Sequence, residues 1–281
     1  MSAKIGIGII HGMGTQNKNF ANTLINDLKS YYGEKNDTKD LYFRSVFWAD
    51  ILQKSENALW KNLKMDDLSF DKLRHFVVHY LADTIAYQKM YEEKKAESKN
   101  DRTVYFRIQE RISEALKDID ENTEPDAPLV LIGHSLGTVM LLNYIYDSQK
   151  SPAQKKTIYW NGKTETGNLA GLILCGSPFA LWTLRKEGFG EAINFPGEKV
   201  KGNLKTISKW VNFYDKDDVL GFPIKNINSS YKKNKQLIDI PVEVDNPVLG
   251  WTPLSHDDYF RTISIIKSIS GFLQNVRNKI N

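Results

Sequence analysis

The chain contains 281 residues, of which 41% are hydrophobic and 26% are charged. This length is enough to bury one sizeable core, so we expect a single domain over residues 1–281. The net charge of +4 is small, and no dense run of lysine and arginine argues for a nucleic-acid partner. Cys175 is the only cysteine, which excludes an internal disulfide.

The apolar stretches of the sequence are short. The first residues, MSAKIGIGII, contain too short an apolar run for a signal peptide. No later run approaches the roughly 18 residues that a membrane span needs. We therefore expect a cytoplasmic protein without a signal peptide or a transmembrane segment.

Residues 4–10, KIGIGII, predict a buried strand that leads into an HGMG loop at residues 11–14. Gly6 and Gly8 match the beginning of the dinucleotide-binding pattern G-x-G-x-x-G. The position of its third glycine is occupied by His11, and no P-loop lysine pattern follows. The sequence therefore disfavours both types of nucleotide-binding loop.

The next elements alternate between helix and strand until a long helical stretch begins. We expect an amphipathic helix over residues 20–32 and an aromatic-rich strand over residues 41–48. Residues 49–100 contain only helical patterns, which is more than one crossover helix needs, so we expect a helical cap or lid inserted there. Its aromatic residues would line a pocket beneath the lid or form a core of their own: Trp60, Phe70, Phe76, Tyr80, Tyr87 and Tyr91. Residues 102–119 predict the next helix.

Residues 128–146, PLVLIGHSLGTVMLLNYIY, predict a buried strand, a tight turn and a helix. The turn is G-x-S-x-G in the context that a nucleophile elbow requires. Ser135 would stand on strained backbone, and Gly133 and Gly137 would let the strand and helix approach closely. Leu136 would offer its backbone N–H to a developing oxyanion. The alternative is an ordinary turn with a buried serine.

These motifs resemble the α/β-hydrolase superfamily, and within it the lipase- and esterase-like serine hydrolases with a GHSLG elbow. The HGMG loop is similar to the HG-x-G oxyanion loop of these enzymes, and residues 44–52, RSVFWADIL, look like the strand and insertion start in some of them. The resemblance implies that the backbone N–H groups of Met13 and Leu136 form the oxyanion hole. It also implies an α/β-hydrolase fold trimmed at its N-terminus, because the usual preceding hairpin is missing.

In this fold the catalytic residues follow the chain order Ser, Asp or Glu, then His. The chain has five histidines, and only His256 follows Ser135. His256 is therefore the expected general base, placed after a long loop and before the last helix. The alternative is a surface histidine at the start of that helix.

The triad acid should follow a core strand between these two residues. Residues 207–214 predict such a strand, and DKDD follows it at residues 215–218. Residues 212–224, NFYDKDDVLGFPI, resemble a lipase-like pattern in which the triad acid is followed by a small apolar turn and a proline. The resemblance implies that Asp218, immediately before the apolar turn, is the acid. Asp215 is the second choice, being nearest the strand end, and Asp217 is expected to face solvent.

The rest of the chain completes an α/β pattern. Residues 169–176 predict a buried strand, and residues 219–253 a long connection with a short strand at 235–242. From His256 on, an amphipathic final helix is expected. Strands alternating with helices predict a mostly parallel sheet with helices on both faces.

The remaining histidines and the cysteine suggest no cofactor or metal. His75 and His79 are four residues apart on a predicted helix, but no H-E-x-x-H pattern or third ligand accompanies them. His11 and His134 are expected to brace the loops by hydrogen bonds. Cys175 lies in an apolar strand and is expected to be inert.

The function expected from these residues is cleavage of a carboxylic ester through an acyl-enzyme. The same triad would serve a thioesterase, an amidase or an acyltransferase. A non-catalytic α/β-hydrolase-fold binding protein is the alternative from another class. The expected partner is a small-molecule or lipid-like ester, with peripheral membrane contact through the lid; the oligomeric state is not predicted.

Overall fold

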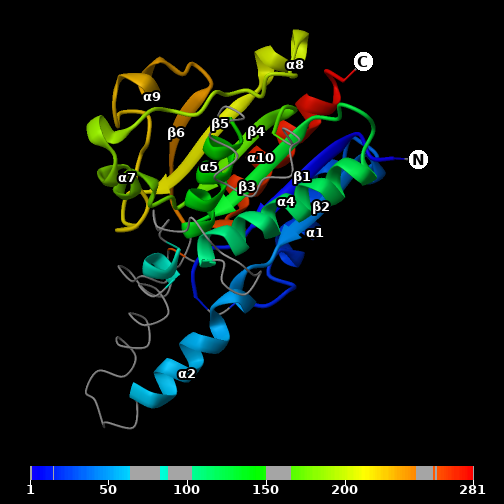
Figure 1. Ribbon diagram of the computed structural model, residues 1–281. Coiled ribbons are helices and arrows are strands. Elements are labelled where there is room, and N and C mark those ends of the chain that lie inside the picture. The colour runs from blue at the N-terminus through cyan, green and yellow to red at the C-terminus, as the bar shows by residue number, and fades with distance from the viewer. Residues whose placement is uncertain are drawn as a thin grey trace.

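Six parallel strands form one sheet at the centre of the computed structural model, in the order β2-β1-β3-β4-β5-β6 (Figure 1). The strands are β1 Ile5–Ile10, β2 Leu41–Val46, β3 Leu129–His134, β4 Leu169–Cys175, β5 Lys209–Asp215 and β6 Leu237–Val242. The structure describes residues 2–14, 16–63, 83–87, 103–149, 166–244, 256 and 258–280. The expected α/β class with a parallel sheet is confirmed.

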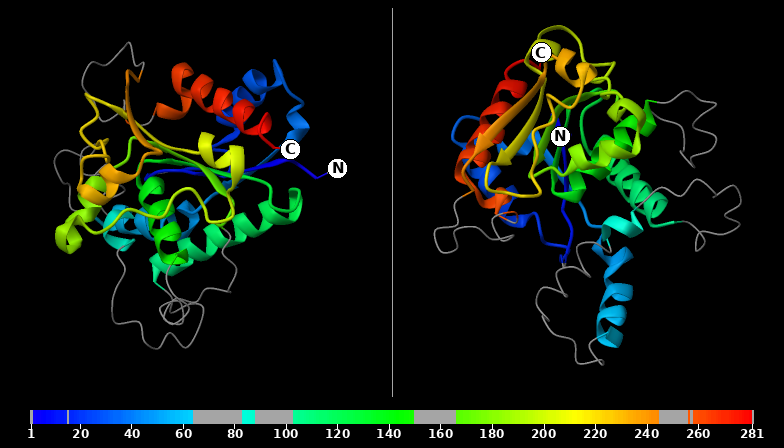
Figure 2. Two further views of the ribbon diagram at one scale, coloured as in Figure 1. Left: turned by 90° about the horizontal axis from the view of Figure 1, so that it is seen from above. Right: turned by 90° about the vertical axis from the view of Figure 1, so that its left-hand side faces the viewer.

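Helices cover both faces of the sheet (Figure 2). One face carries α1, Asn22–Gly33, and α10, Ile263–Arg277, and the other carries α4, Val104–Asn122, and α5, Leu136–Ser148. Because both faces are covered, β1, β3 and β4 are buried at every position and are almost entirely apolar.

Shorter helices lie around this centre. They are α2 Gln53–Leu63, α7 Phe179–Trp182, α8 Gly202–Ile207 and α9 Ser229–Lys233. The 3-10 turns are η1 Thr38–Asp40, η2 Ala49–Ile51, η5 Thr183–Arg185, η6 Glu187–Phe189 and η8 Tyr259–Arg261. In Figure 1, α2 projects away from the sheet and its covering helices.

The strand order reverses between β1 and β3. The chain passes from β1 to β2 on one side and then returns to place β3 on the other side. In open parallel sheets, ligands bind beyond the carboxyl ends of the strands at such a reversal. The loops that follow β1 and β3 are the HGMG loop and the GHSLG turn, so the fold brings these two motifs to one place.

One expectation about the C-terminal part needs correction, and another is confirmed. The last helix begins at Ile263, so His256 precedes it with η8 in between rather than opening it. The short strand expected within the long connection is β6, which pairs along its whole length with β5 and forms one edge of the sheet. Only Leu237 of this strand is buried, and the other residues are half-buried or exposed, as suits an edge strand.

Part of the expected insertion lies outside the described residues. Of residues 49–100, the structure describes η2, α2 and a helical turn at residues 83–86 that ends at Tyr87. Four of the expected pocket aromatics, Phe70, Phe76, Tyr80 and Tyr91, are not among them. Within the described part of the chain, no helix is long and apolar enough to cross a membrane.

Candidate active site

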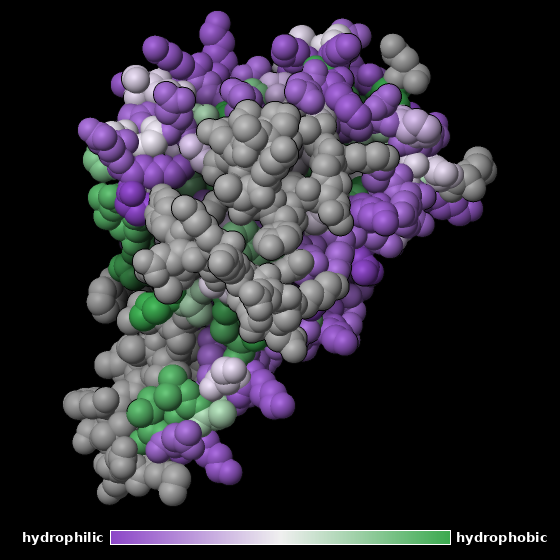
Figure 3. Space-filling view, viewed as in Figure 1, coloured by the Kyte–Doolittle hydropathy of each residue, from purple (hydrophilic) through white to green (hydrophobic). Residues whose placement is uncertain are grey.

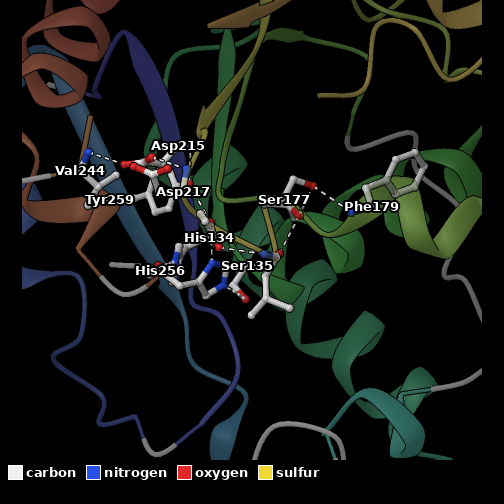
Figure 4. Close-up of polar contacts among 12 residues, drawn as sticks. His134, Ser135, Ser177, Phe179, Asp215, Asp217, Val244, His256 and Tyr259 are labelled. Atoms are coloured by element: carbon white, nitrogen blue, oxygen red, sulfur yellow. Dashed lines mark hydrogen bonds and ion pairs between the residues drawn. The ribbon is translucent and has the colours of Figure 1, made fainter. Parts of the chain in front are cut away.

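Ser135, His256 and Asp218 meet beyond the carboxyl ends of β3 and β5. Ser135 Oγ lies 2.7 Å from His256 Nε2, and His256 Nδ1 lies 2.8 Å from Asp218 Oδ2. All three side chains are buried. Figure 4 shows the His256 ring directed at Ser135. The imidazole therefore connects the hydroxyl to the carboxylate in one continuous hydrogen-bonded chain.

The backbone of Ser135 adopts the strained conformation expected of a nucleophile elbow. Its φ is 52° and its ψ is −128°, in a region that non-glycine residues rarely occupy. Such a conformation costs on the order of 1–3 kcal/mol and persists only where the surrounding structure enforces it. The Ser135 N–H donates to the Cys175 carbonyl at 2.9 Å, which ties the turn to the end of β4.

A second set of hydrogen bonds holds the carbonyl side of the same turn. Thr138 Oγ1 donates to the Ser135 carbonyl at 2.6 Å and lies 2.6 Å from Ser177 Oγ. The Phe179 N–H donates to Ser177 Oγ at 3.3 Å (Figure 4). Because Thr138 uses its proton on the carbonyl, Ser177 must donate to Thr138. Sequence reasoning missed Ser177, since a lone serine after β4 forms no motif.

Glycines allow the HGMG loop to pack directly on the elbow. A Cβ placed on Gly12 would lie 2.6 Å from Ser135 Cβ, and one on Gly137 would collide with the His11 carbonyl. Backbone from the two loops is therefore in contact beside the serine. Met13 belongs to this loop and Leu136 is the first residue of α5. This is the place where both oxyanion donors were expected, and their role stays a prediction.

The aspartates after β5 have different hydrogen-bond partners. Asp218 faces His256, and its Oδ1 accepts the Leu220 N–H at 2.9 Å. Asp215 is turned away: its Oδ2 accepts the Val244 N–H at 2.7 Å and its Oδ1 accepts the Asp217 N–H at 2.9 Å (Figure 4). Asp217 is exposed, as expected.

Tyr259 is a further component of the site that sequence reasoning missed. Its hydroxyl donates to Asp218 Oδ2 at 2.8 Å and accepts the Asp215 N–H at 2.8 Å. Burial alone would raise the pKa of Asp218. The hydrogen bond and charge of His256 and the donors Leu220 N–H and Tyr259 O–H outweigh burial, so this pKa is lowered. The carboxylate therefore stays ionised at neutral pH.

His11 and His134 brace the loops, as expected. His11 Nε2 accepts the Trp48 N–H at 3.1 Å, and its Nδ1 lies 2.7 Å from the Gly12 carbonyl and donates to it. His134 Nε2 donates to the His256 carbonyl at 2.6 Å. Burial lowers the pKa of His11 to about 4 and that of His134 to about 3, so both rings are neutral near pH 7.

The described residues offer no set of metal ligands around this site. No group of three or more His, Cys, Asp or Glu side chains with suitable geometry occurs among them. The expected pair His75 and His79 lies outside the described part of the chain. Cys175 is fully buried in β4, and burial raises the pKa of its thiol, which agrees with an inert residue.

Comparisons with known proteins assign neither a family nor a function to this chain. No protein-family model matches the chain, and no curated protein matches its sequence. The conclusions about function therefore depend on the geometry of the residues described above.

Proposed function

We propose that the chain is a serine hydrolase that cleaves a carboxylic ester through an acyl-enzyme. The observation that carries the proposal is the continuous hydrogen-bonded chain from Ser135 through His256 to Asp218. A serine hydroxyl is a weak nucleophile, and it needs a base that an acid orients. The strained backbone of Ser135 supports the same conclusion, because strain of this kind gathers at functional sites.

In the proposed reaction, Ser135 Oγ attacks the ester carbonyl carbon while His256 Nε2 takes the hydroxyl proton. Asp218 accepts the Nδ1–H of His256 and stabilises the imidazolium that forms. The negative oxygen of the tetrahedral intermediate binds to the N–H groups of Met13 and Leu136. His256 then protonates the leaving alcohol, and the acyl group remains on Ser135.

Water completes the cycle. His256 removes a proton from the water, which attacks the acyl carbon and forms a second tetrahedral intermediate. Its collapse breaks the bond to Ser135 Oγ, and His256 returns the proton to that oxygen. The products are the free carboxylic acid and the unchanged enzyme, so the triad needs no cofactor.

We also propose that this is an α/β-hydrolase fold, with residues 49–100 as a helical cap. The projecting helix α2 supports the cap (Figure 1). Exposed apolar side chains favour a lipid-like ester and contact with a membrane surface: Leu59, Ile85, Leu181 and Leu184. In Figure 3, hydrophobic surface is gathered along one side of the molecule, from the level of α7 down to α2.

Labelling with a fluorophosphonate probe tests the proposal. The wild type should be labelled, and Ser135→Ala and His256→Ala should not, whereas Ser230→Ala on α9 should react like the wild type. Ester, thioester and amide substrates then identify the bond that is cleaved, with alcohols as alternative acyl acceptors. A folded wild type that neither reacts with the probe nor hydrolyses any ester would refute the proposal and favour a binding scaffold.

A further inference from the structure

Two consecutive residues of the insertion contact the HGMG loop. Asp83 Oδ2 accepts the backbone N–H of Gly14 at 3.1 Å, and Thr84 Oγ1 donates to Met13 Sδ at 3.2 Å. Asp83 is only 2% exposed. The segment at residues 83–87 is therefore in direct contact with the loop that lies against Ser135.

Tyr87 anchors the same segment in the main core. Its ring is fully buried and lies 5.1 Å from that of Tyr105, measured between centroids. Its hydroxyl accepts hydrogen bonds from Gln109 Nε2 at 2.6 Å and from Asn143 Nδ2 at 3.3 Å. Asn143 belongs to α5, the helix that begins at the elbow.

The two anchors are joined by one turn of helix. The Tyr87 N–H donates to the Asp83 carbonyl at 2.9 Å, so Asp83 and Tyr87 stand at the two ends of a single turn. Because Tyr87 is fixed in the core by α4 and α5, Asp83 at the other end of the turn is held in place relative to the elbow. A short rigid segment thus connects the HGMG loop to the helix that follows Ser135.

A second carboxyl group, from α2, meets Asp83. Glu56 is buried and forms a side-chain hydrogen bond with Asp83. Burial, followed by the hydrogen bond and charge of Glu56, raises the pKa of Asp83 to about 9, against the lowering effect of the Gly14 N–H. The Asp83 carboxyl is therefore protonated at neutral pH.

We propose that Asp83 is a positioning residue for the oxyanion loop, acting through its hydrogen bond to the Gly14 N–H while its carboxyl hydrogen-bonds with Glu56. The inference rests on the proposed function, because it assigns the Met13 N–H to the oxyanion. The peptide group between Met13 and Gly14 carries the N–H that Asp83 accepts. Fixing that peptide also limits rotation of the preceding one, which carries the Met13 N–H.

Asparagine at position 83 can reproduce the contacts of the protonated acid. Its carbonyl oxygen can accept the Gly14 N–H, and its amide can donate to a carboxyl oxygen of Glu56. Alanine can do neither. Asp83→Asn therefore loses only the titratable acid, whereas Asp83→Ala also loses the contact with the loop.

The experiment measures ester hydrolysis by the full chain for the wild type, Asp83→Ala and Asp83→Asn. Asp83→Ala should lower kcat by between about 10- and 100-fold with little change in KM, since a displaced oxyanion donor affects the transition state more than substrate binding. Asp83→Asn should restore most of kcat. Asp40→Ala is the matched control, because Asp40 pairs with Arg277 at 2.7 Å beyond the amino end of β2.

Amide hydrogen exchange at Gly14, followed by NMR in the same proteins, tests the contact independently of activity. Gly14 should be protected in the wild type and Asp83→Asn, and exposed to exchange in Asp83→Ala. An inactive wild type that keeps this pattern would refute the proposed function, yet uphold the positioning of the loop. An active Asp83→Ala with wild-type kcat, or a Gly14 amide insensitive to both substitutions, would overturn the inference.

Discussion

The hydroxyl of Tyr259 donates to Asp218 Oδ2, the same carboxylate oxygen that lies 2.8 Å from His256 Nδ1. The oxygen is thus shared between the imidazole and the phenol. Because the phenol also accepts the Asp215 N–H, it links the end of β5 to the acid. Tyr259 thereby orients the carboxylate and stabilises its negative charge with a hydrogen bond.

Replacing Tyr259 with phenylalanine should weaken the site without abolishing it. The variant loses the hydrogen-bond donor to the Asp218 carboxylate and the acceptor for the Asp215 N–H. This loss should cost about 1–3 kcal/mol of stability. We expect kcat to fall by roughly tenfold, corresponding to about 1.4 kcal/mol in the barrier. Steady-state kinetics and urea unfolding measure the two effects.

Tyr42→Phe is the control for this substitution. The Tyr42 hydroxyl also donates to an aspartate, Asp118 Oδ2, at 2.8 Å, but between β2 and α4. It should lose stability and retain kcat. Equal kcat in Tyr259→Phe and the wild type would show that the phenol does not orient the acid.

Replacement by asparagine should affect kcat at Asp218 and stability at Asp215. Asp218→Asn removes the charge opposite the imidazole and permits the wrong ring tautomer, so kcat should fall by roughly 10³- to 10⁴-fold with the fold intact. Asp215→Asn should mainly reduce stability, by about 1–3 kcal/mol, because its NH2 group must face one of two backbone N–H donors. Probe labelling and thermal unfolding compare them. A fully folded Asp215→Asn with the larger loss of kcat would reverse the assignment.

The sequence was sufficient to predict the elements and loops with strong local patterns. Strands buried on both faces need apolar runs, and the predictions of β1 and β3 from such runs are confirmed. The glycines beside Ser135 are needed because the strand and the helix pack closely there. The signal for β6 was weaker, since this edge strand is short and buries only its first residue, Leu237. Tyr259 and Ser177 could not be predicted, because their partners are distant in sequence and become neighbours only through the sheet order.

The buried histidines should make the protein sensitive to acid. The folded-state pKa of His11 is about 4, and burial depresses it below the unfolded value of about 6.5. The unfolded chain therefore binds more protons between these values, and stability falls as the pH falls through this window. Each such histidine contributes at most about 1.4 kcal/mol per pH unit.

Replacing His11 with glutamine should make this acid sensitivity shallower. Glutamine keeps one acceptor and one donor but does not titrate, so the slope of unfolding free energy against pH should decrease between pH 6.5 and pH 4. Urea unfolding at several pH values in this range measures the slope. An unchanged slope in a folded variant would mean that His11 is not held neutral.

The acid pair at Asp83 should have the opposite dependence on pH. The folded-state pKa of Asp83, about 9, lies above the unfolded value of about 3.9, so the folded chain binds more protons between these values. Stability should therefore decrease as the pH rises toward 9. Asp83→Asn removes this titration, and its advantage over the wild type should grow with pH by at most about 1.4 kcal/mol per unit.

Urea unfolding at pH 5, 7 and 8.5 measures this advantage. Glu56→Gln should show the same trend, because it removes the charge that helps to raise the pKa of Asp83. The double variant should gain less than the sum of the single variants, as expected for two residues in contact. If Asp83→Asn instead lost stability equally at every pH, the carboxyl would be ionised in the folded protein, and its bond to the Gly14 N–H would be that of a charged acceptor.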